Sequence, residues 1–277
     1  CNSIHDLAKS VKQDETMQQF FDLKLKYYNL SKSSKMPPRA VRLIGQYKER
    51  IVEHYIRRYQ PFYDIMFIAK NGDIFFTIKK EADYHSNIFT GKLAKTKLSQ
   101  QLSKAPSECF VDFQYFFPSD EPAAFFVKPA YKGKEQIGWF AFQWAVNKLN
   151  SLCTDDEGLG LTGEVFLVNK AQYALTDSRF FSDSTIMKRH LSQDNVHAKF
   201  REKKGNRIVV DYRGFRVLST FEVVPFLGSE YLILVKRDED EIITEHYKTN
   251  RKHYREQIVD YLASRSAKAG AGLKRGK

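Results

Sequence analysis

The sequence contains little cysteine and no long apolar run. Its three cysteines, Cys1, Cys109 and Cys153, show no CxxC or other ligand spacing, and an odd number of thiols cannot all pair within one chain. We therefore expect isolated thiols and no disulfide framework. No window approaches roughly 18 consecutive apolar residues, so we expect neither a membrane span nor a signal peptide within these residues.

The sequence also lacks the motifs of common catalytic and phosphate-binding sites. It has no Gly-x-Ser-x-Gly elbow, no phosphate-binding glycine loop and no His-Glu-x-x-His pair. Among the seven histidines, His190 with His197 and His246 with His253 are each seven residues apart, which is about two helical turns. That separation is too large for two ligands of one metal ion unless other ligands converge. We predict that the chain is not an enzyme and that it holds no metal and no cofactor.

A repeated pattern is the main positive feature of the chain. FIAKNGDIFFTIKKE begins at Phe67 and FLVNKAQYALTDSRF begins at Phe166, and each consists of an apolar run, a turn and a second run. A polar stretch and three apolar strands follow each of them. A period of about 100 residues is too long for a solenoid, so it indicates two tandem domains of one plan. The 277 residues, of which 42% are hydrophobic, suffice for two cores.

The N-terminal region, residues 1–60, is predicted to be helical. Apolar residues recur there at steps of three and four and form a stripe on each of two segments: Met17, Phe20, Phe21, Leu25 and Tyr28, and then Val41, Ile44, Ile51, Tyr55 and Tyr59. The stretch from Met36 to Pro38 should break or kink the helix between them, because proline interrupts helical hydrogen bonds. We expect a long N-terminal helix that lies beside two stacked sheets.

The first sheet is predicted to begin with a hairpin over residues 63–78. Asn71 and Gly72 separate its two apolar runs, and both residue types tolerate the positive φ angles of a type I′ turn. Residues 82–105 are polar with weak helical spacing, and we expect them to cross one face of the sheet. A five-stranded antiparallel sheet would be completed by strands over residues 109–117, 123–131 and 136–146.

The net charge of +12 is concentrated at the C-terminal end. Residues 248–277 carry nine basic and two acidic side chains. Clustered lysine and arginine can indicate nucleic-acid binding, but the predicted sheets hold only a small share of the excess charge here. The tail could instead lie on anionic lipid headgroups or bind an acidic partner, or it could be solvated and partly disordered. We expect no nucleic-acid partner.

Several blocks of the sequence resemble a double Cache sensor domain: YDIMFIAKNGDIFFTIKKEADY, VDFQYFFPSDEPAAFFVKPAY, IGWFAFQWAVNKLN, GLGLTGEVFLVNKAQYALTDSRF and IVVDYRGFRVLSTFEVV. The similarity spans about residues 40–242. This family supplies the extracytoplasmic part of many bacterial chemoreceptors, sensor histidine kinases and cyclases. The resemblance implies an α+β fold: a long N-terminal helix and two tandem PAS-like modules, each a mainly antiparallel five-stranded sheet flanked by helices.

The resemblance also implies a division of the chain into four parts. These are an N-terminal long helical region, 1–60; a membrane-distal module, 61–153; a membrane-proximal module, 154–242; and a C-terminal helix with a basic tail, 243–277.

In this family the ligand usually binds in the distal module, between the sheet and the segments laid over it. Strand alternation then selects the side chains that we expect to line the ligand site: Asp83, Tyr84, Asp112, Tyr115, Phe125, Trp139 and Gln143. Members that sense amino acids carry an Arg-x-Trp-Tyr signature before the third strand and an Asp on the fifth. Neither feature is present here, where the fifth strand carries Gln143. We therefore expect a small neutral or weakly charged metabolite as the ligand, and not an α-amino acid.

We predict an extracytoplasmic ligand-sensing domain that binds a small molecule in the distal module and signals across the membrane, as in chemoreceptors and sensor kinases. The alternative is a stand-alone exported lipoprotein that uses the fold as a binding or structural scaffold module, because Cys1 could be a lipid-modified first residue. Either form would be periplasmic and attached to the membrane. The helical ends would allow a homodimer or an envelope partner protein.

Overall fold

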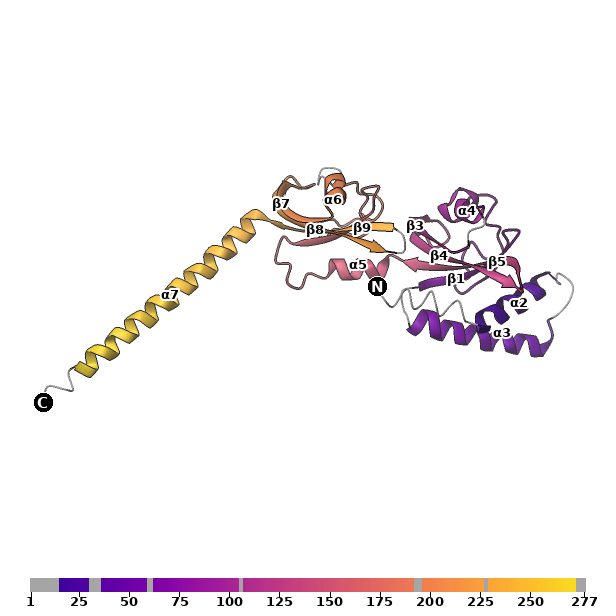
Figure 1. Ribbon diagram of the computed structural model, residues 1–277, viewed down its shortest axis with the longest axis horizontal. Coiled ribbons are helices and arrows are strands. Elements are labelled where there is room, and N and C mark those ends of the chain that lie inside the picture. Colours follow the sequence, from indigo (N-terminus) through magenta and orange to yellow (C-terminus); the bar gives the residue numbers. More distant parts are fainter. Residues whose placement is uncertain are drawn as a thin grey trace.

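The computed structural model describes residues 15–29, 36–58, 62–104, 107–191, 196–226 and 229–272. Two antiparallel sheets follow one another along the chain, and a long helix leaves the second (Figure 1). The strands are β1 (Phe62–Ala69), β2 (Ile74–Thr77), β3 (Cys109–Phe116), β4 (Glu121–Lys132), β5 (Glu135–Ala145), β6 (Glu164–Val168), β7 (Lys204–Val210), β8 (Arg216–Phe226) and β9 (Ser229–Asp238). The helices are α2 (Glu15–Asn29), α3 (Pro38–Ile51), η1 (Val52–Arg58), η2 (Leu93–Lys95), α4 (Lys97–Leu102), α5 (Asn147–Thr154), α6 (Val196–Glu202) and α7 (Glu239–Gly272). The fold is α+β, as predicted.

The N-terminal region forms two helices in place of the expected long one. α3 begins at Pro38, which lacks an N–H and therefore fits the first turn of a helix but not its interior, so the predicted break is confirmed. α2 and α3 pack against each other beside the first sheet (Figure 1). The expected helix beside both sheets is thus replaced by a helical pair beside the first. Val41 of the second predicted stripe is exposed, and Tyr59 and Cys1 lie outside the described residues.

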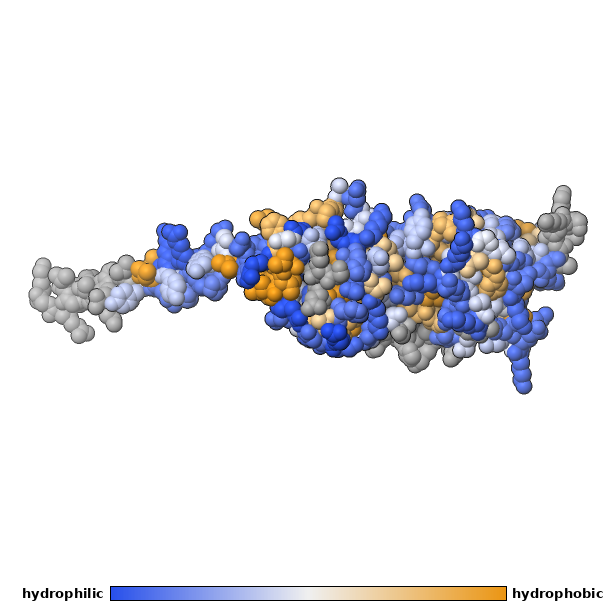
Figure 2. Space-filling model, turned by 90° about the horizontal axis from the view of Figure 1, so that it is seen from above, coloured by the Kyte–Doolittle hydropathy of each residue, from blue (hydrophilic) through white to orange (hydrophobic). Residues whose placement is uncertain are grey.

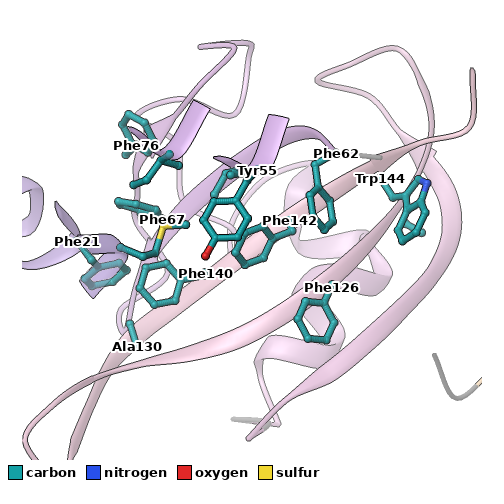
Figure 3. Close-up of a cluster of buried hydrophobic side chains, with 14 of the residues drawn as sticks. Phe21, Tyr55, Phe62, Phe67, Phe76, Phe126, Ala130, Phe140, Phe142 and Trp144 are labelled. Carbon is teal, nitrogen blue, oxygen red and sulfur yellow. The ribbon is translucent and has the colours of Figure 1, made fainter. Parts of the chain in front are cut away.

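The aromatic stripe of α2 fills the core of the first module, which comprises α2, α3 and β1 to β5 with the segments between them. The ring centroid of the fully buried Phe21 lies 5.3 Å from that of Phe67 and 5.0 Å from that of Phe140. Figure 3 shows these rings beside Phe142. Burying a phenylalanine side chain contributes about 1.5–3 kcal/mol, so the stripe fastens the helical pair to the sheet.

The hairpin at the start of the first sheet is confirmed, but its turn differs from the prediction. Gly72 has a φ of +94°, whereas Asn71 is not among the described residues with positive φ. The N–H of Ala69 donates to the carbonyl of Asp73 at 2.8 Å. This is the geometry of a three-residue loop with glycine in the left-handed region, so the predicted type I′ turn is wrong.

The segment after β2 covers the other face of the first sheet, as predicted for residues 82–105. Leu93 of η2 and Leu98 and Leu102 of α4 are buried, and they pack in one cluster with Phe125 of β4. This segment, residues 79–104, is called the covering segment below. Polar side chains on the sheet face beneath it are withdrawn from water.

The second sheet has four strands in the described part of the chain, in the order β6-β9-β8-β7, so the expectation of five is wrong. The run after β6 that was expected to be a strand makes only an isolated bridge, between Val168 and Ala174. The N–H of Leu167 donates to the side-chain Oγ1 of Thr176 at 3.0 Å. Because a side chain takes this donor, the backbone ladder does not continue past the bridge. β6 to β9, α6 and their connections form the second module.

α7 leaves the second module directly after β9 (Figure 1). Glu241 holds its first turn, because it accepts the N–H groups of Leu161 at 2.8 Å and Thr162 at 2.9 Å and an N–H of Arg237 at 2.9 Å. Farther along, the described surface of α7 is mainly hydrophilic, with isolated apolar side chains (Figure 2). None of the helices within the described ranges combines the length and the apolar character needed to cross a bilayer.

Candidate functional site

A buried carboxylate marks the covered face of the first sheet. Asp64 is the one charged residue in the strand sequence FYDIMFIA, and its side chain is fully buried. Its Oδ1 accepts the backbone N–H groups of Ile65 at 2.7 Å, Ile78 at 2.8 Å and Lys79 at 3.3 Å. Its Oδ2 is also buried and has no hydrogen-bond partner among the described residues. A buried polar atom without a partner is unfavourable and uncommon in native proteins.

A second buried carboxyl, Asp83, lies in the covering segment. Its side chain is 1% exposed, and its Oδ1 has no hydrogen-bond partner in the described part of the chain. Burial raises the pKa of Asp64 to about 7; its backbone hydrogen bonds oppose this rise, and the charge of Asp83 adds to it. Burial likewise raises the pKa of Asp83 to about 6, and the charge of Glu81 adds to this rise. Asp64 and Asp83 therefore lie within range of each other's charge.

Gln143 lies beside Asp64 on the same face of the sheet. The two residues are in register in the pairing of β1 with β5, as are Met66 and Ala141, which belong to the cluster under the covering segment. The Nε2 of Gln143 donates to the Oγ of Ser119 at 3.0 Å. Its buried Oε1 has no partner among the residues that the structure describes.

Asp64, Asp83, Gln143 and Ser119 form what we call the acceptor site. Each of its two carboxyls and its amide has one buried oxygen without a hydrogen bond among the described residues. Each such acceptor lowers the stability of the folded protein by about 1–3 kcal/mol. A molecule with hydrogen-bond donors would satisfy these atoms. No group of three or more His, Cys, Asp or Glu side chains suited to a metal ion occurs within the described ranges.

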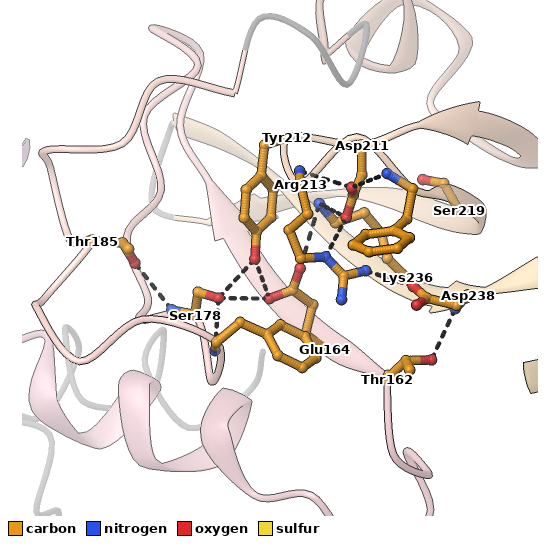
Figure 4. Close-up of polar contacts among 12 residues, drawn as sticks. Thr162, Glu164, Ser178, Thr185, Asp211, Tyr212, Arg213, Ser219, Lys236 and Asp238 are labelled. Carbon is orange, nitrogen blue, oxygen red and sulfur yellow. Dashed lines mark hydrogen bonds and ion pairs between the residues drawn. The ribbon is translucent and has the colours of Figure 1, made fainter.

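The second module carries a buried ion-pair network on its own sheet (Figure 4). Glu164 and Lys236 are in register in the pairing of β6 with β9. The Nζ of Lys236 lies 3.6 Å from Oε1 of Glu164 and 3.8 Å from Oδ2 of Asp211. The hydroxyls of Ser178 and Tyr212 each donate to Oε2 of Glu164 at 2.9 Å. Burial raises the pKa of Glu164, and the charge of Lys236 opposes that rise.

The sequence Asp177-Ser178-Arg179 braces the turn at residues 179–180, between β6 and α6. Asp177 accepts the N–H of Thr185 at 2.8 Å, and Arg179 donates to the carbonyl of Gly163 at 2.9 Å. These contacts tie the turn to its surroundings, so the polar cluster has a structural role.

No protein-family model and no curated protein matches the sequence, but solved structures match the fold. The chain is similar to the extracellular domain of a protein described as a histidine kinase, vpHK1S-Z8, with a TM-score of 0.58, 11% identity and 88% of each chain covered. It is similar to the periplasmic sensory domain of the Campylobacter jejuni chemoreceptor Tlp1, with a TM-score of 0.53, 10% identity and coverage of 82% of this chain and 91% of that one. An extracellular ligand-binding receptor from Desulfohalobium retbaense gives a TM-score of 0.52 at 11% identity over 83% of this chain, which spans 39% of that receptor.

The chain has the fold of these solved sensory and ligand-binding domains. Within the first module, Asp83 and Gln143 are the two predicted site residues that belong to the acceptor site. Phe125 is buried and in register with Gln143, on the strand next to it. Trp139 lies on the same face, but it is four residues from Gln143 along β5, about 13 Å away. Its buried Nε1 has no partner among the described residues.

The side chains of the other three predicted residues make contacts of their own. Tyr84 packs on the ring of His85, with centroids 3.8 Å apart. Tyr115 is 57% exposed and its hydroxyl bonds to Asp120. Asp112 accepts a hydrogen bond from Tyr231 of the second module. For Asp112 and Tyr115 the physical reason lies in β3, where the register shifts between Val111 and Gln114, so simple alternation does not assign the faces of this strand.

Sequence reasoning missed Asp64 and Ser119. A detectable signal existed for Asp64, because a lone acid inside the apolar run FYDIMFIA is either paired or functional. Ser119 lies in the turn between β3 and β4, and nothing in its local sequence distinguishes it from an ordinary turn serine.

The contact between the two modules includes a hydrogen bond and aromatic rings. The hydroxyl of Tyr231 on β9 donates to Oδ1 of Asp112 on β3 at 2.6 Å. Phe226 lies 5.0 Å from Trp144 and 5.8 Å from Phe110, measured between ring centroids. β9 thus contacts the first module near its start and leads into α7 at its end.

Removing the hydroxyl of Tyr231 should weaken this contact without opening a cavity. We expect Tyr231→Phe to lower the free energy of unfolding by about 1.5–3 kcal/mol, because a buried tyrosine loses a hydrogen bond to a charged acceptor. Urea denaturation followed by fluorescence measures the loss, and Tyr173→Phe serves as the control outside this contact. An equal change in both variants would show that the hydrogen bond to Asp112 contributes nothing specific.

Proposed function

We propose that the chain is the extracytoplasmic ligand-sensing domain of a membrane-attached signalling protein, and that it binds a small molecule at the acceptor site of the first module. The observation that carries the proposal is the group of buried, unbonded oxygens on Asp64, Asp83 and Gln143, between the sheet and the covering segment. Native proteins satisfy nearly all such atoms, so exceptions that gather in one place favour a binding site. The similarity of the fold to periplasmic and extracellular sensory domains supports the class of function.

In this proposal α7 carries the output toward the membrane. A ligand that binds two conformations with different affinity shifts their populations, whereas equal affinity shifts nothing. The proposed path runs from the first sheet to β9 through Tyr231 and Asp112, and then into α7. β9 ends at Asp238 and α7 begins at Glu239, so a displacement of the strand reaches the helix without an intervening loop.

A thermal-shift screen tests the binding step. The panel contains amino acids, amines, organic acids, sugars and purines, each in phosphate buffer. A ligand present at about 100 times its Kd contributes about 2.7 kcal/mol, so we expect at least one class to raise Tm by roughly 5–10 °C. Asp83→Asn should remove the shift, whereas Asp183→Asn, an exposed acid in the second module, should retain it.

Two results would contradict the proposal. One is a panel in which no class changes Tm. The other is a shift that is the same in the wild type and in Asp83→Asn, since the ligand would then bind outside the acceptor site.

A further inference from the structure

The two modules allow an internal comparison of one structural position. In each module the first strand pairs antiparallel with the last, and the first acid on the covered face is in register with a residue of the last strand. The matched pairs are Asp64 with Gln143, Met66 with Ala141 and Ile68 with Trp139 in the first module, and Glu164 with Lys236, Phe166 with Leu234 and Val168 with Leu232 in the second. The acids Asp64 and Glu164 therefore occupy equivalent positions.

The second module supplies a cation at this position from its own chain. Lys236 is fully buried, and its Nζ lies within 4 Å of Glu164 and of a second acid, Asp211. Such a buried carboxylate is tolerated when an opposite charge compensates it. In the second module, therefore, a positive charge from the chain itself compensates two buried acids.

The first module has the two acids without the cation. Gln143 stands where the second module has Lys236, and it carries no charge. Asp83 is the second acid here, as Asp211 is in the other module. Among the residues that the structure describes, neither Asp64 nor Asp83 forms an ion pair with a lysine, arginine or histidine.

We propose that the ligand of the acceptor site is a small organic cation whose ammonium group takes the place that the Nζ of Lys236 has in the second module. An ammonium group has three N–H donors, and the unbonded acceptors are Oδ2 of Asp64, Oδ1 of Asp83 and Oε1 of Gln143. This inference rests on the proposed function and narrows its ligand class. It departs from the neutral or weakly charged metabolite expected from the sequence, because that expectation did not include Asp64.

The surroundings of the site agree with this ligand class. Ala141 stands next to Gln143 on the covered face where the second module has the larger Leu234, so the first module has the smaller side chain at this place. The charge of Asp83 acts on Asp64 and the charge of Glu81 acts on Asp83, and both of these groups are acidic. Burial, and to a smaller degree these neighbouring acids, raise both pKa values, and a bound cation would lower them again.

Matched probes test the charge of the ligand. We would measure Tm in phosphate buffer with putrescine and ethanolamine as cations, with 1,4-butanediol and ethylene glycol as neutral counterparts, and with succinate and glycolate as acids. We expect a cation to raise Tm by roughly 5 °C or more at saturation, and no change with its neutral counterpart. Asp64→Asn should abolish the response to the cation.

A substitution tests the same idea without any added ligand. Gln143→Lys places an ammonium group opposite Asp64, as in the second module, and Gln143→Met has a similar length without the charge. We expect Gln143→Lys to have a higher Tm than Gln143→Met and to show no response to the cationic probes. If Gln143→Lys is no more stable than Gln143→Met, or fails to fold while Gln143→Met folds, the inference is overturned.

The outcomes separate the two proposals. If neutral or acidic probes raise Tm and the cations do not, the proposed ligand-sensing function is supported and the proposal of a cationic ligand is wrong. If no probe and no member of the wider panel raises Tm, the proposed function fails, and the comparison of Gln143→Lys with Gln143→Met still decides whether the site requires a cation.

Discussion

Lys236→Met is expected to lower the free energy of unfolding by about 3–5 kcal/mol. Lys236 is fully buried between Glu164 and Asp211, so its loss leaves two buried acids with less compensation. Methionine keeps most of the apolar stem, so the change reports mainly the charge. Arg213 still donates to Asp211 at 2.8 Å, which protects that acid and leaves Glu164 as the group most affected. Urea denaturation monitored by circular dichroism measures the effect.

The matched control is Lys204→Met. Lys204 also lies on a strand of the second sheet and pairs with Glu222 at 3.1 Å, but its side chain is 74% exposed. Surface ion pairs contribute about 0–1 kcal/mol, so we expect at most that loss. Similar losses in the two variants would mean that burial of the network adds nothing, and that the lysine of the second module is a poor guide to the first.

The first sheet could be predicted because its signals are local. The two apolar runs around Asn71 and Gly72 define a hairpin whatever the turn type, since glycine alone supplies the positive φ that the observed loop needs. The proline at the start of α3 likewise fixes a helix boundary within the chain itself. The prediction of a fifth strand in the second sheet was wrong because a side chain replaces a backbone acceptor. The Oγ1 of Thr176 accepts the N–H of Leu167, which therefore does not join a backbone ladder.

The acceptor site could be predicted only in part. Gln143 and Asp83 were selected from the sequence because a regular strand and a segment that covers the sheet could be placed there. Asp112 and Tyr115 were assigned to the ligand site on the assumption of regular alternation along β3. The strand has a register shift between Val111 and Gln114, and its sequence gives no sign of that shift. Asp64 was recognised as a site residue only from the structure, which shows that its buried Oδ2 has no hydrogen-bond partner among the described residues.

The stability of the ligand-free protein is expected to fall as the pH rises from about 4 to about 7. The pKa of Asp64 is raised from 3.8 in its ordinary state to about 7 by burial, so the folded protein holds a proton that the unfolded chain releases in this window. Stability from this group is fully present below the lower value and is lost as the pH passes the higher one. The loss is on the order of 4 kcal/mol, because each pKa unit corresponds to about 1.4 kcal/mol. Asp83, with its pKa raised to about 6 by burial, acts in the same direction over part of this range.

Asp64→Asn isolates this effect, because asparagine resembles the protonated acid and does not titrate. We expect the variant to match the wild type near pH 4 and to be more stable by a few kcal/mol at pH 8, with Asp183→Asn following the wild-type profile throughout. Urea denaturation at each pH, in buffers free of amines, gives both curves. If the wild type and Asp64→Asn lose stability equally with rising pH, Asp64 is already compensated in the folded protein. A bound cation would then have no unmet charge to neutralise at the acceptor site.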